Sequence, residues 1–318
     1  DGAESMLLTP RGLKRLKLDS QRQTQRWANF EQRVKTVTDG PERGLELALY
    51  YAVTGDATAR KQALEWLASH RRDARQAALV EDWCGAQPAS GESSSAGEAS
   101  LAGQPPSAAR DAIFSVIARG GNAAKLVDAW WPGVLQKLEA GEWRTDATEL
   151  AALYELIDVV EMQYRRDLRR DDSALFSTLP AQFLLLLPEE ELMHPQWQTK
   201  HAALMMVTAD PNLQSASFVQ GWAMEDSKLL RDGPGVLYEF LLGNPYLPGL
   251  GFYNMNLWVY EDDTGRLVAR SGWEGKVCRL VVTPSGWQTT DCPPDLRKNP
   301  AKFGKLTLMP VERNCAEV

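Results

Sequence analysis

Two histidines near position 200 have a spacing that places them on one face of a helix. His194 and His201 are seven residues apart, and Pro195 between them is a favourable residue for the start of a helix. Trp197 and Gln198 share this face. Such a stripe could contact a sugar, with a histidine as base, the glutamine as hydrogen-bond donor and the tryptophan as stacking platform. Alternatively, the histidines form hydrogen bonds inside the core or at its edge.

A second group of candidates lies in the segment GFYNMN at 251–256, where the pattern changes from helical to β. Tyr253 could serve as an acid or a base, and Asn254 could donate a hydrogen bond to a substrate carboxylate. Asn256 follows in the same segment, and Tyr246 in NPYLPG is a second aromatic candidate for substrate binding. The alternative interpretation is interdomain packing with polar caps.

Residues of these types suit acid–base catalysis, in which a Tyr or His base removes a proton and an acid protonates a leaving oxygen. A donor or cation beside a substrate carboxylate would make the adjacent C–H more acidic. A metal site would need a third ligand beside the two histidines, and the sequence identifies none. No GxGxxG, Walker, GxSxG or HExxH motif is present. We therefore expect no cofactor and no metal.

Composition describes a globular chain without the marks of a nucleic-acid or membrane protein. Its 318 residues are 44% apolar and 24% charged, and the net charge of -7 gives no support for nucleic-acid binding. The sequence contains no apolar run long enough to cross a bilayer. It starts at Asp1 without a methionine or an apolar signal segment, as a mature secreted form or a trimmed chain would. We expect a secreted or periplasmic protein.

The periodicity predicts helices over most of the chain. A long helix should follow the capping pair Thr9-Pro10, and Gly55-Asp56 should separate two others. Further helices are predicted at 107–119, 122–140 with a break at Pro132, 146–165, 173–187, 195–209, 213–231 and 235–242. Short turns between them indicate antiparallel neighbours. Between them, residues 85–108 are rich in Gly, Ser, Ala and Pro and should form a flexible loop.

After Asn256 the period changes to two, which is typical of strands. The segments NLWVYE, RLVARSGW, VCRLVVT, GWQTTDC and KLTLMPV predict five short strands in a small antiparallel sheet with one face on the helices. The chain thus divides into a helical domain at 1–244 and a small β domain at 245–318. Cys278 and Cys292 could form a disulfide if the protein is exported, or remain free buried thiols.

Several sequence segments resemble segments of the heparinase II/III-like and alginate-lyase-like polysaccharide lyases. They are LLTPRGLKRLK, LALYYAVTGDATARKQALEWL, VEDWC, HPQWQTKHAALMMVTA and GRLVARSGWEGKVCRLVV, which together span nearly the whole chain. The resemblance implies a mainly α fold, an incomplete α/α toroid of antiparallel helical hairpins followed by a β domain. It also implies β-elimination on an acidic polysaccharide or oligosaccharide.

Other functions stay open. Where those lyases have an Asn-His pair at the start of the groove helix, this chain has Met193-His194, and its β part is short. One alternative is therefore a catalytically inactive carbohydrate-binding or structural toroid. A further alternative is a helical protein-interaction module. The sequence does not indicate an oligomeric state.

Overall fold

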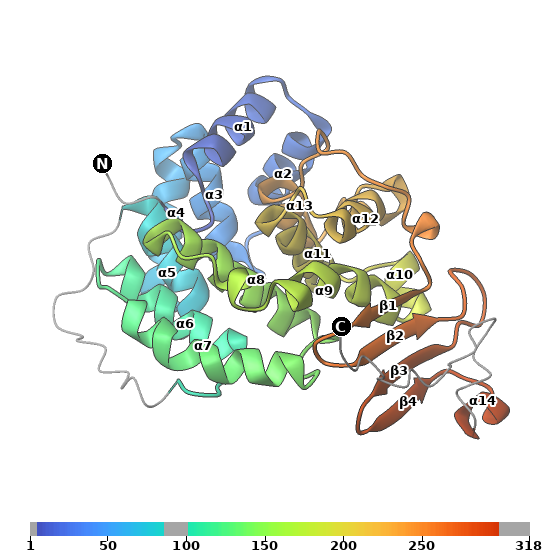
Figure 1. Cartoon of the computed structure of the whole chain (residues 1–318). Coiled ribbons are helices and arrows are strands. Elements are labelled where there is room, and N and C mark those ends of the chain that lie inside the picture. Colours follow the sequence, from blue (N-terminus) through green and yellow to red (C-terminus); the bar gives the residue numbers. More distant parts are fainter. Residues whose placement is uncertain (1–4, 86–100, 299–318) are drawn as a thin grey trace.

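The computed structural model describes residues 5–85 and 101–298, and it is mainly helical with a small antiparallel sheet at the C-terminal end (Figure 1). This confirms the predicted mainly α class with a small C-terminal antiparallel sheet, whereas the toroid arrangement stays a prediction. The helices are α1 (Pro10–Gln21), α2 (Gln25–Thr36), α3 (Arg43–Thr54), α4 (Ala57–Ser69), α5 (Ala74–Cys84), α6 (Pro106–Ala118), α7 (Ala124–Glu139), α8 (Ala147–Tyr164), α9 (Ser173–Leu186), α10 (Glu189–Met193), α11 (Trp197–Ala209), α12 (Gln214–Ala223), α13 (Gly235–Leu241) and α14 (Pro294–Lys298). Short 3₁₀ turns are η2 (Leu168–Asp172), η3 (Asp226–Lys228) and η4 (Phe252–Asn254).

Capping residues set the helix boundaries where the sequence predicts them. The Thr9 hydroxyl accepts a hydrogen bond from the backbone N–H of Gly12 at the start of α1. Gly55 ends α3 in the left-handed conformation, with φ of 77°, and the Asp56 carboxylate caps the first turn of α4. Asp146 caps α8 in the same way.

The predicted long first helix is wrong, because the chain breaks into α1 and α2. Gln23 takes a positive φ of 52°, and the Thr24 hydroxyl accepts a hydrogen bond from the backbone N–H of Trp27 to start α2. The break predicted at Pro132 is also wrong, since α7 continues through it with Trp130 and Trp131 both buried. Burying two indoles outweighs the one backbone hydrogen bond that a proline removes.

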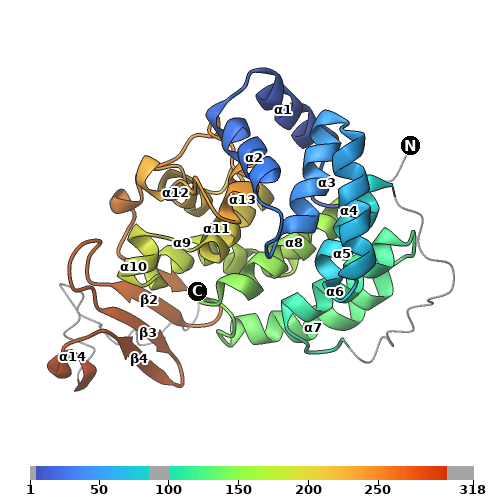
Figure 2. The same cartoon turned by 180° about the vertical axis from the view of Figure 1, so that it is seen from behind.

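In the helical part, α8 and α11 pack against each other near the middle (Figures 1 and 2). Helices α6, α12 and α13 pack around this pair. The helix predicted at 213–231 ends earlier, at Ala223. There Gly221 lies against the backbone of Leu250, which brings the chain leading to the sheet close to α12.

The sheet has the strand order β1-β2-β3-β4, with every neighbouring pair antiparallel. Its strands are β1 (Trp258–Glu261), β2 (Arg266–Arg270), β3 (Arg279–Thr283) and β4 (Gly286–Thr290). Val268 pairs with Val281, and both pack toward the helical core. Arg270 donates a hydrogen bond of 2.6 Å to the carbonyl oxygen of Leu187, just after α9. One face of the sheet therefore lies on the helices, as predicted, whereas the fifth predicted strand and most of the predicted loop lie outside the described residues.

Of the two alternatives for the cysteines, the structure has the disulfide, between Cys278 and Cys292. Cys84 is a buried free thiol. Among the helices in the described ranges, none combines the length and the apolar character needed to cross a membrane.

Candidate functional site

A cavity of about 270 Å³ lies where five helices converge, and we call it the His201 cavity. Its walls come from α5, α6, α8, α11 and α13 and from the residues before α3 and α5. The lining residues are Glu42, Asp73, Arg75, Arg110, Thr148, Ala151, Trp197, Gln198, His201 and Tyr238. Larger hollows exist elsewhere on the protein, but this one concentrates ionisable side chains, as active sites do.

Helix α11 supplies three of these side chains because it begins at Trp197. Gln198 follows directly, and His201 lies one turn further along, so that all three face the cavity wall. Lys200 anchors the helix in the core, with its amine 2.8 Å from the Glu239 carboxylate. The sequence stripe therefore correctly brings His201, Trp197 and Gln198 to one place.

A buried ion network lies behind the cavity. Glu155 of α8 is fully buried, with its carboxylate 2.5 Å from Nη2 of Arg75 and 3.1 Å from Nη1 of Arg110. Arg75 also binds Glu42 at 3.1 Å, and Arg110 binds Asp111 at 2.8 Å. Burial would raise the pKa of Glu155, but the two guanidinium groups reverse this and hold it well below the usual value. Glu155 is therefore a permanent negative charge.

His201 and Tyr238 form the chemically most suggestive pair in the cavity wall. Their rings stack with 3.8 Å between centroids and 19° between planes. Burial lowers the pKa of His201, although Glu155 acts in the opposite direction. Burial also raises the pKa of Tyr238 well above 10, and the nearby Glu42 and Glu155 add to this. At neutral pH the pair consists of a neutral imidazole and a protonated phenol.

Several buried polar atoms in this wall have no hydrogen-bond partner in the described part of the chain. They are the hydroxyl of Tyr238, Nε2 of His201 and Oε1 of Gln198. Nε2 of His201 lies 3.1 Å from Oε1 of Glu155, but it is not aligned for a hydrogen bond. The Tyr238 hydroxyl similarly lies beside the Glu42 carboxylate, which leaves Oε1 of Gln198 as the atom of the three that needs a ligand or a water molecule as its partner.

Trp197 extends the aromatic wall of the cavity. Its ring stacks on Tyr238, with centroids 5.7 Å apart and planes 1° apart. The wall therefore runs from Trp197 across Tyr238 to His201. Flat aromatic surfaces next to polar groups suit the apolar face and the hydroxyl groups of a sugar ring.

The other predicted site residues lie elsewhere. His194 is exposed at the end of α10, where its backbone N–H donates to the carbonyl oxygen of Glu190. Tyr253 and Asn254 are exposed in η4, which packs against α12 rather than against the cavity helices. His194, Tyr253 and Asn254 therefore do not lie in one cleft with His201.

The two remaining predicted binding residues are also exposed and outside the His201 cavity. Asn256 lies just before β1, and Tyr246 lines a separate hollow beside α1. The physical reason is the path of the chain, which leaves α13 on the side of α12 and reaches the sheet without passing the cavity.

Sequence reasoning missed the ion network and Tyr238. Glu155 sits among apolar residues of α8, in a stripe that the periodicity assigns to the core. A charged residue is almost never fully buried unless it is paired. An acid within that apolar stripe therefore indicates a buried ion pair. The partners of Glu155, Arg75 and Arg110, are 80 and 45 residues away in sequence, which no local pattern can reveal.

Comparison with known proteins adds no assignment. No protein-family model matches the chain, and no curated protein matches its sequence. The resemblance to polysaccharide lyases therefore stays a prediction. In the described ranges, no group of three or more His, Cys, Asp or Glu side chains is arranged to hold a metal ion.

Proposed function

We propose that the His201 cavity binds a unit of an acidic polysaccharide and that the protein is a lyase that cleaves this polymer by β-elimination. The observation that supports the proposal most is the stacked pair of His201 and Tyr238. The stacking brings together an unprotonated imidazole, which can accept a proton, and a protonated phenol, which can donate one. Oε1 of Gln198, which has no partner in the described residues, leaves a site for a hydrogen bond from a substrate hydroxyl group.

Each side chain has a definite role in this reaction. The Glu155 carboxylate beside Nε2 favours a proton on that nitrogen, which leaves Nδ1 of His201 as the basic atom. His201 removes the proton from the carbon that bears the substrate carboxylate. The electron pair of that C–H bond forms a double bond to the next ring carbon as the bond to the glycosidic oxygen breaks, and Tyr238 donates its proton to this oxygen. Proton return from His201 to Tyr238 restores both groups.

Further side chains of the cavity wall would support the substrate. The amide of Gln198 can donate a hydrogen bond to the carboxylate, and the positive charges of Arg75 and Arg110 lie in the same wall. Trp197 provides a flat surface for a sugar ring. A wall of stacked rings also makes a helical protein-interaction module the weaker alternative.

A second candidate is a carbohydrate-binding protein that does not cleave its ligand. Arg75 and Arg110 are already paired with Glu155, Glu42 and Asp111, so neither is an uncommitted cation for the substrate carboxylate. Without such a group, the C–H bond would be less acidic and the reaction slower. The same aromatic wall would then serve recognition alone.

Incubation with alginates, heparins, chondroitins and pectins separates these functions, because β-elimination creates an unsaturated uronate that absorbs ultraviolet light. We expect absorbance to rise with one of these polymers, and the rise to be lost in Tyr238→Phe and His201→Gln. His194→Gln is the matched control, since His194 lies outside the cavity. Thermal stabilisation by a polymer without a rise in absorbance would favour the binding protein. Neither response with any polymer would contradict both candidates.

The disulfide also supports export to an oxidising compartment, where acidic polysaccharides occur. We accordingly propose a periplasmic or secreted location. Fractionation of cells that express the native gene would test it, and a protein found only in the reducing cytosol would contradict it.

A further inference from the structure

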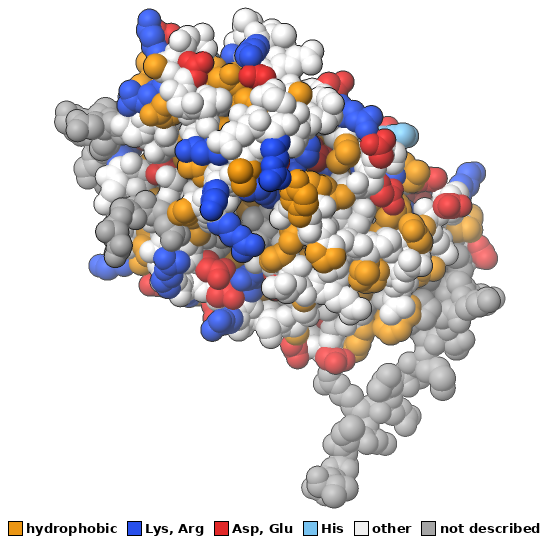
Figure 3. Space-filling model, turned by 90° about the horizontal axis from the view of Figure 1, so that it is seen from above, with side chains coloured by type: hydrophobic (Ala, Val, Ile, Leu, Met, Phe, Trp, Pro, Cys, Tyr) orange, Lys and Arg blue, Asp and Glu red, His pale blue; other side chains and the backbone are white. Residues whose placement is uncertain are grey.

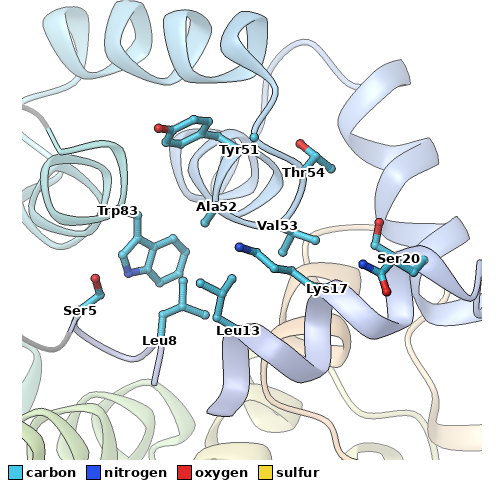
Figure 4. A pocket seen from close by; sticks show the side chains of 12 residues that line it. Ser5, Leu8, Leu13, Lys17, Ser20, Tyr51, Ala52, Val53, Thr54 and Trp83 are labelled. Atoms are coloured by element: carbon cyan, nitrogen blue, oxygen red, sulfur yellow. The ribbon is translucent and has the colours of Figure 1, made fainter. Parts of the chain in front are cut away.

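Helix α1 forms a ridge between two hollows that are separate from the His201 cavity. On one side lies a hollow of about 690 Å³, with Lys17, Tyr51 and Trp83 in its wall (Figure 4). On the other side lies a hollow of about 440 Å³, with Arg11, Arg15 and Tyr246 in its wall. Leu8 lines both hollows, and neither shares a lining residue with the His201 cavity.

The sequence of α1 places cations on both flanks of this ridge. Leu13, Lys17, Ser20 and Gln21 repeat at intervals of three and four residues, and all four line the larger hollow. Arg11 and Arg15 are also four residues apart, but on the opposite flank, where they line the smaller hollow. Lys14 is exposed between the two flanks. Positive charge therefore continues from one hollow to the other across the helix.

Three of the four cations of α1 are not neutralised within the described part of the protein. Arg11, Lys14 and Lys17 are exposed, and none of them has an ion pair there. The fourth cation, Arg15, is attracted by the buried Asp19, the one acidic residue of α1. Figure 3 looks onto the α1 side, where Lys and Arg side chains gather across the middle of the face. A local excess of positive charge in a chain of net charge -7 marks a surface for an anionic partner.

The larger hollow combines a cation with aromatic and hydroxyl groups. In Figure 4 the Lys17 side chain extends from α1 into the hollow, toward Ala52 and Trp83. Ser20 contributes a hydroxyl group, and Tyr51 a second aromatic ring. A carboxylate could pair with the amine while the ring of the same sugar contacts the apolar wall.

The smaller hollow also combines a cation with an aromatic ring. Arg15 is held by a hydrogen bond of 2.7 Å from its Nη2 to the carbonyl oxygen of Leu241, and its buried Nε has no partner in the described residues. Tyr246 is 70% exposed, so its ring is free to stack. Asp158 is the one acid of this hollow, and burial raises its pKa to about 6.

We propose that the α1 ridge is a second binding surface for a segment of an acidic polysaccharide, with one acidic sugar in each hollow. The choice of a polysaccharide over another polyanion rests on the proposed function and on the aromatic ring beside the cations in each hollow. A remote surface of this kind holds a long chain near the enzyme, so it increases the affinity for polymers but not for disaccharides.

The test compares two double variants that change the charge equally. Lys14→Glu with Lys17→Glu reverses two cations of the ridge, and Lys125→Glu with Lys276→Glu reverses two exposed lysines of α7 and of the sheet region. Binding of alginate and polygalacturonate, as polymers and as disaccharides, is measured by calorimetry at low and high salt. We expect the ridge variant to bind polymer about tenfold more weakly at low salt, with disaccharide binding unchanged. The control should keep the affinity of the unaltered protein.

Equal affinity of both variants for polymer, or no binding of either polymer by the unaltered protein, would overturn the proposal. Single-stranded RNA and polyphosphate are tested in the same way. If the protein binds either of them as tightly as it binds the polyuronates, the assignment to sugars is overturned. The lyase proposal is tested separately from the ridge. A protein that binds polyuronate through the ridge without producing unsaturated uronate would keep the ridge and lose the lyase.

Discussion

The imidazole of His201 stacks on the phenol ring of Tyr238, with 3.8 Å between their centroids, although the residues belong to different helices, α11 and α13. Both are buried beside the same cavity. Burial lowers the pKa of the first and raises that of the second, so at neutral pH His201 has a nitrogen that can accept a proton and Tyr238 has a proton that it can donate. The buried ion pairs of Glu155 keep this arrangement in place.

Tyr238→Phe should remove function without removing stability. The hydroxyl lies beside the Glu42 carboxylate but forms no well-aligned hydrogen bond in the described residues, so its loss should change the free energy of unfolding by no more than about 1 kcal/mol. Chemical denaturation measures this value, and the polymer assay measures activity. Tyr164→Phe is the matched control, because the Tyr164 hydroxyl accepts a hydrogen bond of 2.8 Å from the backbone N–H of Ala123. The control should lose stability and keep activity, and the opposite pattern would contradict our assignment.

Glu155→Gln should destabilise the fold strongly. The substitution leaves Arg75 and Arg110 buried without the carboxylate that both of them bind. Breaking a buried pair by removing one partner costs roughly 3–5 kcal/mol. Urea denaturation should show a correspondingly lower midpoint, whereas Glu65→Gln, which removes an exposed acid, should not. A midpoint for Glu155→Gln equal to that of the unaltered protein would show that the network does not hold the cavity together.

The local structure of this protein follows closely from its sequence, with exceptions that have physical causes. Gly55 and Asp56 mark a helix boundary by their intrinsic preferences, and four strands form where the change of period predicts them. The break at Gln23 carries no such signal, because a glutamine rarely takes a positive φ.

The candidate site was only partly predictable, for a different reason. The spacing on one helix correctly groups Trp197, Gln198 and His201. The pairing of Arg75 with Glu155 depends on how α5 and α8 pack, which is a tertiary property. For the same reason the sequence favoured Tyr253 as the acid, whereas the ring that meets His201 belongs to Tyr238.

Asp82→Asn should change the pH dependence of stability. Burial raises the pKa of Asp82 to about 6, although its carboxylate accepts a hydrogen bond of 2.7 Å from the backbone N–H of Met6. The folded state therefore binds the proton more tightly than the unfolded state, whose pKa is near 4. Stability from this group is full below pH 4 and falls as the pH rises through 6, by up to about 3 kcal/mol.

Asparagine keeps the acceptor for Met6 but carries no charge, so this loss should disappear. Urea denaturation between pH 4.5 and 7.5 should show that Asp82→Asn gains stability relative to the unaltered protein as the pH rises. The comparison cancels contributions that both proteins share, such as that of His201. Parallel pH profiles would contradict the assignment.

Replacing both Cys278 and Cys292 by serine should destabilise the sheet region. The bridge closes a loop with a sequence separation of 14, and loops of this length correspond to about 3 kcal/mol. Thermal unfolding with and without reductant is the measurement. We expect reductant to lower the melting temperature of the unaltered protein and to leave that of the double variant unchanged. Equal sensitivity of both proteins would mean that the bridge contributes nothing.

The most direct test of the His201 cavity is the NMR signal of its imidazole. The chain has only three histidines, His70, His194 and His201, and the first two are exposed. With isotope-labelled histidine, addition of uronate disaccharides to the Tyr238→Phe variant, which binds without turnover, should shift the His201 signal alone. Assignment follows from the signal missing in His201→Gln. A shift of His201 with unchanged His70 and His194 is the result that we predict, and saturating disaccharides from every polymer of the panel leaving His201 unshifted would contradict the account.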